Sequence, residues 1–293
     1  MTDNLEVKGP RSRPGIGFTA VVVQRNDLRF SRLVVDRPTL IVLGHGTKIL
    51  QSARGQWSVK GGEAIAVAGG QTFDVTNRPS ERGLYEARWL VWDPDILESF
   101  ERTTPAGPVL ADAAALGKVD LEFAAAFDRA CEAIGDTRRV PDAVARHRVT
   151  EVLVWLALKG VRLPTAENPT LAIKVRRLFE SSTGERWTIQ RVAKRLGVSE
   201  ATLRRRLSAE GTTAGDLLTD VRMSQALLLL QSTDQAVNRI ALEVGYESAS
   251  RFAIRFRERF GFPPTAIRGH ARNGEDRPRR SAISDRQAMA PPA

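Results

Sequence analysis

Residues 192–198 read VAKRLGV, and residues 240–246 read IALEVGY. Both stretches follow one pattern: an apolar residue, an alanine, two polar-facing positions, an apolar residue, a glycine and a further apolar residue. A small alanine lets two helices approach closely, and a glycine permits a sharp turn between them. Ser199 and Ser248 follow within two residues and can cap the next helix. The sequence therefore predicts the same turn between two helices twice, 48 residues apart.

The two predicted helix-turn-helix units span residues 188–209 and 237–260. A long apolar-striped helix at residues 214–232 is expected to connect them. Two recognition helices held by one connecting helix can enter successive major grooves of double-stranded DNA, about 34 Å apart on one face. The alternative is a generic helical bundle that touches no DNA.

The positive charge of the chain is concentrated in the same region. The 293 residues carry a net charge of +10. Residues 169–270 hold 17 Lys and Arg against 10 Asp and Glu, whereas residues 1–168 hold 22 against 21. A basic part attached to a neutral part is typical of a protein that binds a polyanion with one part only. The alternative is that the charge only keeps the surface solvated.

Three further stretches carry a family resemblance: RMSQALLLL at residues 222–230, GYES at 245–248 and GFPP at 261–264. Together with the repeat, they make residues 171–268 resemble the DNA-binding domain of the arabinose-operon-regulator (AraC-type) transcription factors. The resemblance implies a sequence-specific, DNA-binding transcriptional regulator, with RNA polymerase as a further partner. Three positions depart from the family pattern, namely Ile254, Pro263 and Ile267.

The outward faces of the two recognition helices supply the candidate DNA-binding residues. Arg204 and Arg205 stand where base-reading residues of the family sit, and an arginine pairs well with guanine. The outward Ile254 of the second unit cannot make that contact, so Arg251 and Arg255 are expected to clamp phosphates. The full candidate set is Ser199, Glu200, Ala201, Arg204, Arg205, Arg206, Ser248, Ser250, Arg251 and Arg255. For each arginine the alternative is an ordinary solvated charge.

The N-terminal part has a different pattern of apolar residues. Residues 15–92 contain short apolar runs broken by Gly, Pro, Asn and Asp, which is typical of antiparallel strands in a sandwich or small barrel. Helical spacing follows at residues 95–102, 121–134 and 141–158, and the last two predict a helical hairpin.

Residues 62–77 read GEAIAVAGGQTFDVTN and resemble a characteristic motif of the cupin barrel. Gly62, Gly70 and Asn77 fall in register with that motif, but Phe73 replaces its metal-binding histidine. The resemblance implies a barrel that has lost its metal, and we expect no metal and no cofactor. The predicted fold class is α+β, with an N-terminal cupin-like β-barrel and helical hairpin and a C-terminal all-α double helix-turn-helix domain.

A barrel without metal can still bind a small-molecule effector in its mouth. Aromatic side chains would line such a pocket, and an arginine would fix a carboxylate or a sugar hydroxyl. The candidate effector pocket comprises Phe18, Arg25, Trp57, Phe73, Tyr85, Arg88 and Trp89. The alternative for each aromatic residue is plain core.

The sequence offers little for catalysis. Cys131 is the only cysteine, and the three histidines, His45, His147 and His270, lie far apart in the sequence. No glycine-rich phosphate loop or Ser/His/Asp arrangement is evident, so we expect no enzymatic activity. The sequence leaves three alternatives open: a regulator that needs no ligand, a small-molecule-processing barrel with a DNA-binding tether, and a nucleoid-type binder without sequence preference.

The expected organisation has four parts. They are a sensor and dimerisation domain at residues 1–158, a linker at 159–170, the DNA-binding domain at 171–270 and a disordered tail at 271–293. The apolar faces of the hairpin could form a homodimer, or could pack only on their own barrel. The sequence shows no apolar signal segment and no run of about 18 apolar residues, so we expect a cytoplasmic protein that does not contact a membrane.

Overall fold

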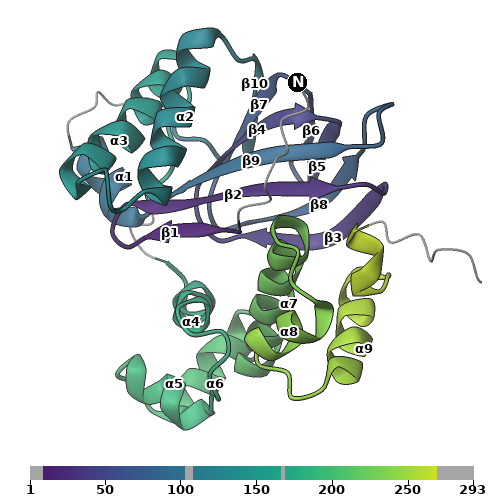
Figure 1. Cartoon of the computed structure of the whole chain (residues 1–293). Helices are drawn as coiled ribbons and strands as arrows, with labels where there is room; N and C mark the ends of the chain where they lie inside the picture. Colours follow the sequence, from purple (N-terminus) through teal and green to yellow (C-terminus); the bar gives the residue numbers. More distant parts are fainter. Residues whose placement is uncertain (1–8, 103–107, 166–168, 269–293) are drawn as a thin grey trace, which may run out of the picture.

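The computed structural model describes residues 9–102, 108–165 and 169–268 (Figure 1). The predicted tail at residues 271–293 and part of the predicted linker lie outside these ranges. Within them, the chain combines two antiparallel sheets with helices, which confirms the predicted α+β class.

A six-stranded sheet forms one layer of the N-terminal part, and its neighbouring strands alternate in direction. Its order is β1 (Arg11–Arg13), β2 (Gly17–Gln24), β9 (Tyr85–Trp92), β4 (Thr39–His45), β7 (Glu63–Val67) and β10 (Ala113–Lys118). A four-stranded sheet forms the facing layer. Its order is β3 (Leu28–Val35), β8 (Gln71–Arg78), β5 (Thr47–Ser52) and β6 (Gly55–Lys60).

The predicted barrel is an open sandwich. Among the described residues, no hydrogen-bonded ladder joins a strand of one sheet to a strand of the other. Helix α9 (Ala249–Phe260) lies against the edge strand β3 instead. There the guanidinium of Arg259 donates hydrogen bonds to the backbone oxygens of Ser31 and Arg32, at 2.7 Å each. A helix therefore covers the strand edge that a closed barrel would pair with a further strand.

Three helices cover the outer face of the six-stranded sheet (Figure 1). They are α1 (Pro94–Glu101), α2 (Leu121–Gly135) and α3 (Asp142–Leu158). Helices α2 and α3 form the expected hairpin, and the indole nitrogen of Trp92 donates a hydrogen bond to the backbone oxygen of Val149 at 2.9 Å. Their buried side chains make a core separate from the interior of the sandwich.

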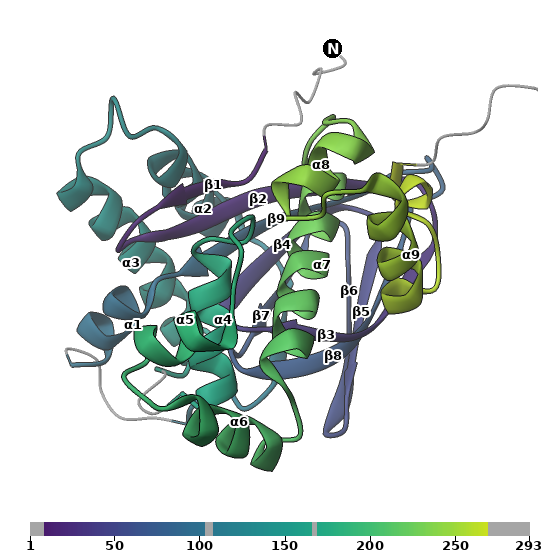
Figure 2. The same cartoon turned by 90° about the horizontal axis from the view of Figure 1, so that it is seen from below.

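Residues 171–260 are helical, as predicted, and end in a 3₁₀ turn at Pro264–Arg268. The helices are α4 (Leu171–Glu180), α5 (Ile189–Arg195), α6 (Glu200–Ala209), α7 (Ala214–Ser232), α8 (Val237–Glu243) and α9. Seen from below, α7 lies across the sheets, with α4 on one side and α9 on the other (Figure 2).

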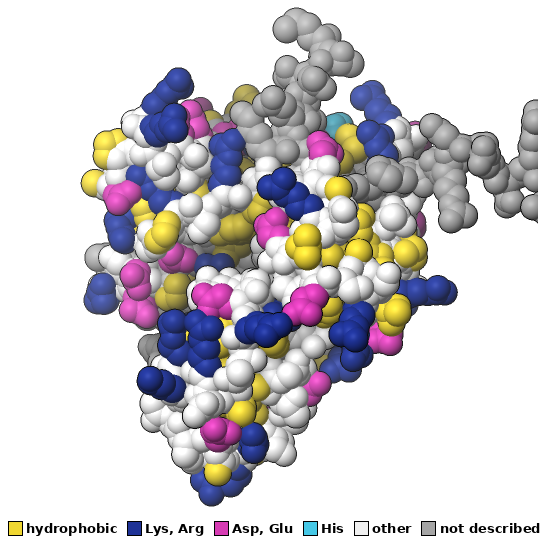
Figure 3. Space-filling view, turned by 60° about the horizontal axis from the view of Figure 1, so that its bottom comes forward, with side chains coloured by type: hydrophobic (Ala, Val, Ile, Leu, Met, Phe, Trp, Pro, Cys, Tyr) yellow, Lys and Arg dark blue, Asp and Glu magenta, His cyan; other side chains and the backbone are white. Residues whose placement is uncertain are grey.

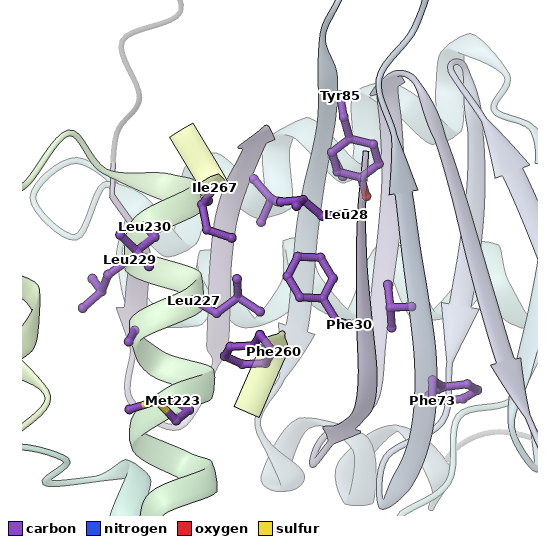
Figure 4. Close-up of a cluster of buried hydrophobic side chains, with 14 of the residues drawn as sticks. Leu28, Phe30, Phe73, Tyr85, Met223, Leu227, Leu229, Leu230, Phe260 and Ile267 are labelled. Carbon is purple, nitrogen blue, oxygen red and sulfur yellow. The ribbon is translucent and has the colours of Figure 1, made fainter. Parts of the chain in front are cut away.

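Helix α7 joins the helical region to the sandwich through one continuous apolar core. Leu227 and Leu230 of α7 belong to the same buried cluster as Leu28 and Phe30 of the strands (Figure 4). The ring of Phe30 also meets that of Phe260, with centroids 5.9 Å apart in an edge-to-face arrangement. Apolar burial of this kind is the main favourable term in packing two elements together, so this core holds α7 against the sheets.

Candidate nucleic-acid interface

The first helix-turn-helix unit is built from α5 and α6. Thr188 caps α5, and Gly197 turns the chain with a positive φ of 66°. The hydroxyl of Ser199 then accepts a hydrogen bond from the backbone N–H of Thr202 at 3.1 Å and caps α6. Leu203 and Leu207 bury one face of α6, so its other face is presented outward.

The second unit repeats this construction in α8 and α9. Gly245 turns the chain with a φ of 85°, and the hydroxyl of Ser248 accepts from the N–H of Arg251 at 3.4 Å. Phe252 and Phe256 are buried. They stand four residues apart, as Leu203 and Leu207 do, and the two recognition helices therefore expose equivalent faces.

Most of the predicted DNA-binding residues lie on these outward faces. Ser199, Ala201, Arg204, Arg205, Arg206, Ser250, Arg251 and Arg255 are exposed, whereas Glu200 and Ser248 are half-buried. Arg204 bonds Glu200 at 3.3 Å, and Arg255 bonds Glu258 at 3.0 Å. Arg205 makes no ion pair within the described part of the chain, so its charge is available to a polyanion.

Arg222 of α7 clamps the two units together. Its guanidinium donates hydrogen bonds to the backbone oxygens of Thr183 and Glu185, at 3.3 and 3.0 Å, in the segment that leads into α5. It also lies over the ring of Tyr246 and directly beneath Gly245. Burial lowers the pKa of Arg222 from its ordinary value. The sequence places Arg222 in the family motif at residues 222–230, but it does not indicate that this side chain links the two units.

An exposed ion pair adds a second link between the units. Arg186 bonds Glu247 at 2.6 Å, and this hydrogen bond lowers the pKa of the Glu247 carboxyl. Figure 3 looks toward the helical region and shows Lys and Arg side chains projecting there among fewer acidic ones. The geometry thus presents two cationic helices from one rigid unit, an arrangement suited to a phosphate-rich surface.

A cavity of about 390 Å³ lies between the interior of the sandwich and helices α4 and α7. Phe18 and Trp89, two of the candidate pocket residues, line it. Other predicted pocket residues lie elsewhere. Arg25 is exposed, and Arg88 faces outward to Asp128 of α2. Trp57 lines a second, more open hollow.

Phe73 and Tyr85 are core residues rather than lining residues. Both are at most 1% exposed, and Phe73 packs edge-to-face on Trp57. Inward-pointing positions of β8 and β9 put these rings into the centre of the sandwich, so the plain-core alternative applies to them.

Lys48 is the cavity residue that sequence reasoning missed. It is 3% exposed, and burial lowers its pKa to about 7. Its Nζ donates to Asn77 Oδ1 at 2.9 Å and to the Tyr85 hydroxyl at 3.3 Å, and no carboxylate pairs with it among the described residues. The buried indole nitrogen of Trp89 has no hydrogen-bond partner there either. A lysine at an inward position of β5, two residues before Leu50, was the available signal.

Polar side chains connect this lysine to α7. Asn77 Nδ2 donates to Gln24 Oε1 at 3.3 Å, and Gln231 Nε2 of α7 donates to the same oxygen at 3.1 Å. All of these side chains are at most 5% exposed. The chain Lys48–Asn77–Gln24–Gln231 is therefore a buried hydrogen-bonded path from the cavity to the helix that carries both units.

Buried charges mark a second polar border of the cavity. Arg176 of α4 pairs with Asp36 at 2.7 Å, with both side chains under 10% exposed. Burial, together with the neighbouring Asp36, raises the pKa of Glu180 to about 8. Within the described ranges, no group of three or more His, Cys, Asp or Glu side chains could hold a metal ion. No described helix is long and apolar enough to cross a membrane.

Comparison with known proteins begins with the C-terminal region. A model of the helix-turn-helix domain matches residues 192–270. GadX of Escherichia coli O6:H1, an HTH-type transcriptional regulator, is 34% identical over 97 residues, which are 33% of this chain and 35% of GadX. Rns of Escherichia coli, a DNA-binding dual transcriptional regulator, is 36% identical over 91 residues, 31% of this chain and 34% of Rns. The match thus spans about a third of these curated relatives.

Solved structures show similarity over most of the chain. An apo variant of ToxT from Vibrio cholerae has a TM-score of 0.60 at 12% identity, covering 87% of this chain and 97% of ToxT. Wild-type ToxT with a bound unsaturated fatty acid has a TM-score of 0.57 at 13% identity, covering 87% and 95%. At this identity the likeness shows a common fold of sandwich and helices.

Because Arg222 contacts only the second turn, replacing the turn glycine by alanine should destabilise the protein more at Gly245 than at Gly197. A methyl group at Gly245 would lie 2.5 Å from the guanidinium of Arg222, whereas at Gly197 it would meet nothing within 4 Å. Both glycines have positive φ, so each alanine variant should lose about 1–2 kcal/mol of unfolding free energy from backbone strain. Gly245→Ala should lose about 2 kcal/mol more, because Arg222 must leave its hydrogen bonds. Urea unfolding measures both, and equal losses would contradict the clamp.

Proposed function

We propose that this chain, whose residues 192–270 match a helix-turn-helix domain model, is a sequence-specific transcriptional regulator of the AraC type that acts on double-stranded DNA. The observation that carries the proposal is the pair of equivalent cationic recognition helices held by α7 and Arg222. The relatives GadX and Rns, both named as transcriptional regulators, support it. Such a regulator works where the chromosome lies, so the proposal places it in the cytoplasm, with RNA polymerase as a further partner and without enzymatic activity.

In this regulator one part of the chain senses the effector and dimerises, and the other part binds DNA. Residues 1–158 form the sensor and dimerisation domain, 159–170 the linker and 171–270 the DNA-binding domain. The candidate DNA-binding residues keep their assignments in α6, in α9 and at the caps of these helices. Arg204 and Arg205 specify sequence, whereas Arg251 and Arg255 contact phosphates and set register.

Two variants test this division of labour after selection of bound sequences from a random duplex pool. Arg204→Ala should lose about tenfold or more discrimination at one base pair, because an arginine pairs with guanine through two hydrogen bonds. Arg251→Ala should weaken binding to all duplexes alike and reduce the dependence of log K on log salt by about one. If the pool yields no enriched sequence with the unsubstituted chain, the regulator proposal fails. If Arg251→Ala erases the preference and Arg204→Ala keeps it, only the division fails.

We propose further that a small carboxylic acid with an apolar body is the effector and occupies the cavity between the sandwich and α7. The apolar lining, the buried amine of Lys48 and the unpaired indole N–H of Trp89 support this ligand class. ToxT, which has the same fold, has been solved with an unsaturated fatty acid and with (E)-4-(8-methylnaphthalen-1-yl)but-3-enoic acid. A carboxylate in the cavity would pair with Lys48 and accept from Trp89.

Lys48→Met tests the effector proposal with that naphthyl acid as the probe and its methyl ester as the control. The acid should bind the variant at least about tenfold more weakly, because a charge-assisted pair is lost. The ester should bind both proteins equally. Binding of the acid should also weaken as the pH rises through about 7, where Lys48 loses its proton. Calorimetry measures these affinities, and equal binding of the acid to both proteins would exclude Lys48 as the anchor.

We also propose a homodimer formed through α2 and α3. Large apolar side chains stand exposed on this hairpin: Leu121, Val144, Val154 and Leu158. Leu121 and Leu158 are adjacent to Asp120 and Lys159, which pair at 3.2 Å and hold the two helix ends together. Exposed apolar side chains on one helical hairpin support an interface between subunits there.

Leu158→Glu should convert the dimer to a monomer, because it places a charge in the buried interface. Light scattering after size exclusion measures the mass. Leu242→Glu is the matched control, since Leu242 is 64% exposed on α8, away from the hairpin. Loss of the dimer in both variants, or in neither, would contradict the proposed interface.

A further inference from the structure

The second recognition helix exposes a large apolar side chain on a cationic face. Ile254 of α9 is 59% exposed, although most large aliphatic residues of the described chain are buried. Arg251 and Arg255, three residues before it and one after, are exposed beside it on the same helix. A single exposed isoleucine is common on protein surfaces, so what it can contact depends on where it lies in the second helix-turn-helix unit.

The internal repeat identifies where Ile254 points. Ser199 and Ser248 are the caps of the two recognition helices, and counting from them places Ile254 at the position of Arg205. The buried residues confirm this rotation, because each helix buries the residues at the fourth and eighth positions after its cap. Ile254 therefore holds, in the second unit, the outward position that Arg205 holds in the first.

We infer that Ile254 reads a thymine in the major groove through contact with its 5-methyl group. The inference rests on the proposed function. Thymine is the base that presents a methyl group in this groove, and apolar side chains contact it. Arg251 and Arg255 would anchor the flanking phosphates and hold the isoleucine against the base edge. The second unit then contributes a modest preference for thymine at one base pair, in addition to its affinity.

Deoxyuridine tests the inference, because it differs from thymidine only by the missing methyl group. Each thymine of the selected duplex is replaced in turn, and binding of the full-length chain is measured. One replacement should weaken binding about fourfold, which corresponds to the burial of a single methyl group. The same replacement should have no effect on the Ile254→Ala variant.

Two further variants separate a base contact from a structural role. Leu242→Ala removes an exposed apolar side chain of α8 and should keep the fourfold effect of deoxyuridine. Ile254→Arg should shift the preferred base at that pair from thymine toward guanine, since an arginine at this position meets the guanine edge.

The outcomes distinguish this inference from the proposed function on which it depends. If the chain selects a sequence but no deoxyuridine replacement depends on Ile254, the thymine contact is overturned and the regulator proposal stands. If the chain selects no sequence at all, both are overturned.

Discussion

The packing of α7 against the β-sandwich is the contact on which the rest of the structure depends. This helix supplies Leu227 and Leu230 to the interior of the sandwich, and it also carries Arg222, which holds both helix-turn-helix units. One helix thus lines the cavity and also connects the two recognition helices. Because packed interiors resist deformation, a shift of α7 on the sheets would move both recognition helices together.

Buried polar groups connect this interface to the cavity. Hydrogen bonds connect α7 to Lys48 through the side chains of Gln231, Gln24 and Asn77. Buried polar groups are costly when a partner is removed, so a ligand that engages Lys48 changes the hydrogen bonding of the whole path. A ligand alters DNA affinity only insofar as it binds one arrangement of α7 more tightly than another.

The helical region could be predicted from its sequence because local signals determine it. Glycine turns, serine caps and apolar spacing are short-range features, and Gly197, Ser199, Gly245 and Ser248 act as their sequence predicts. The spacing of apolar residues and of turn residues also predicts that strands come first in the chain and helices follow. Arg222 lay within a recognised motif, yet its partners are 37 and 39 residues away.

The cavity and the closure of the sheets depend on contacts between distant segments. The sandwich is open where the sequence predicts a barrel, and Arg259 of α9 covers the edge strand β3 through contacts that no local pattern encodes. The predicted pocket mixed inward and outward side chains, because successive residues of β9 point to opposite faces of the sheet. Arg88 therefore faces α2, whereas Lys48 was overlooked although it stands among apolar residues of β5.

Hydrogen exchange resolved along the chain tests most directly whether α7 unites the two parts. If α7 is part of the sandwich core, amides of α7 near Leu227 should open with the same free energy as amides of β2 and β9. Opening of α7 at a clearly lower free energy, while the strands stay protected, would contradict the account. In that case the helix-turn-helix units would move independently of the cavity.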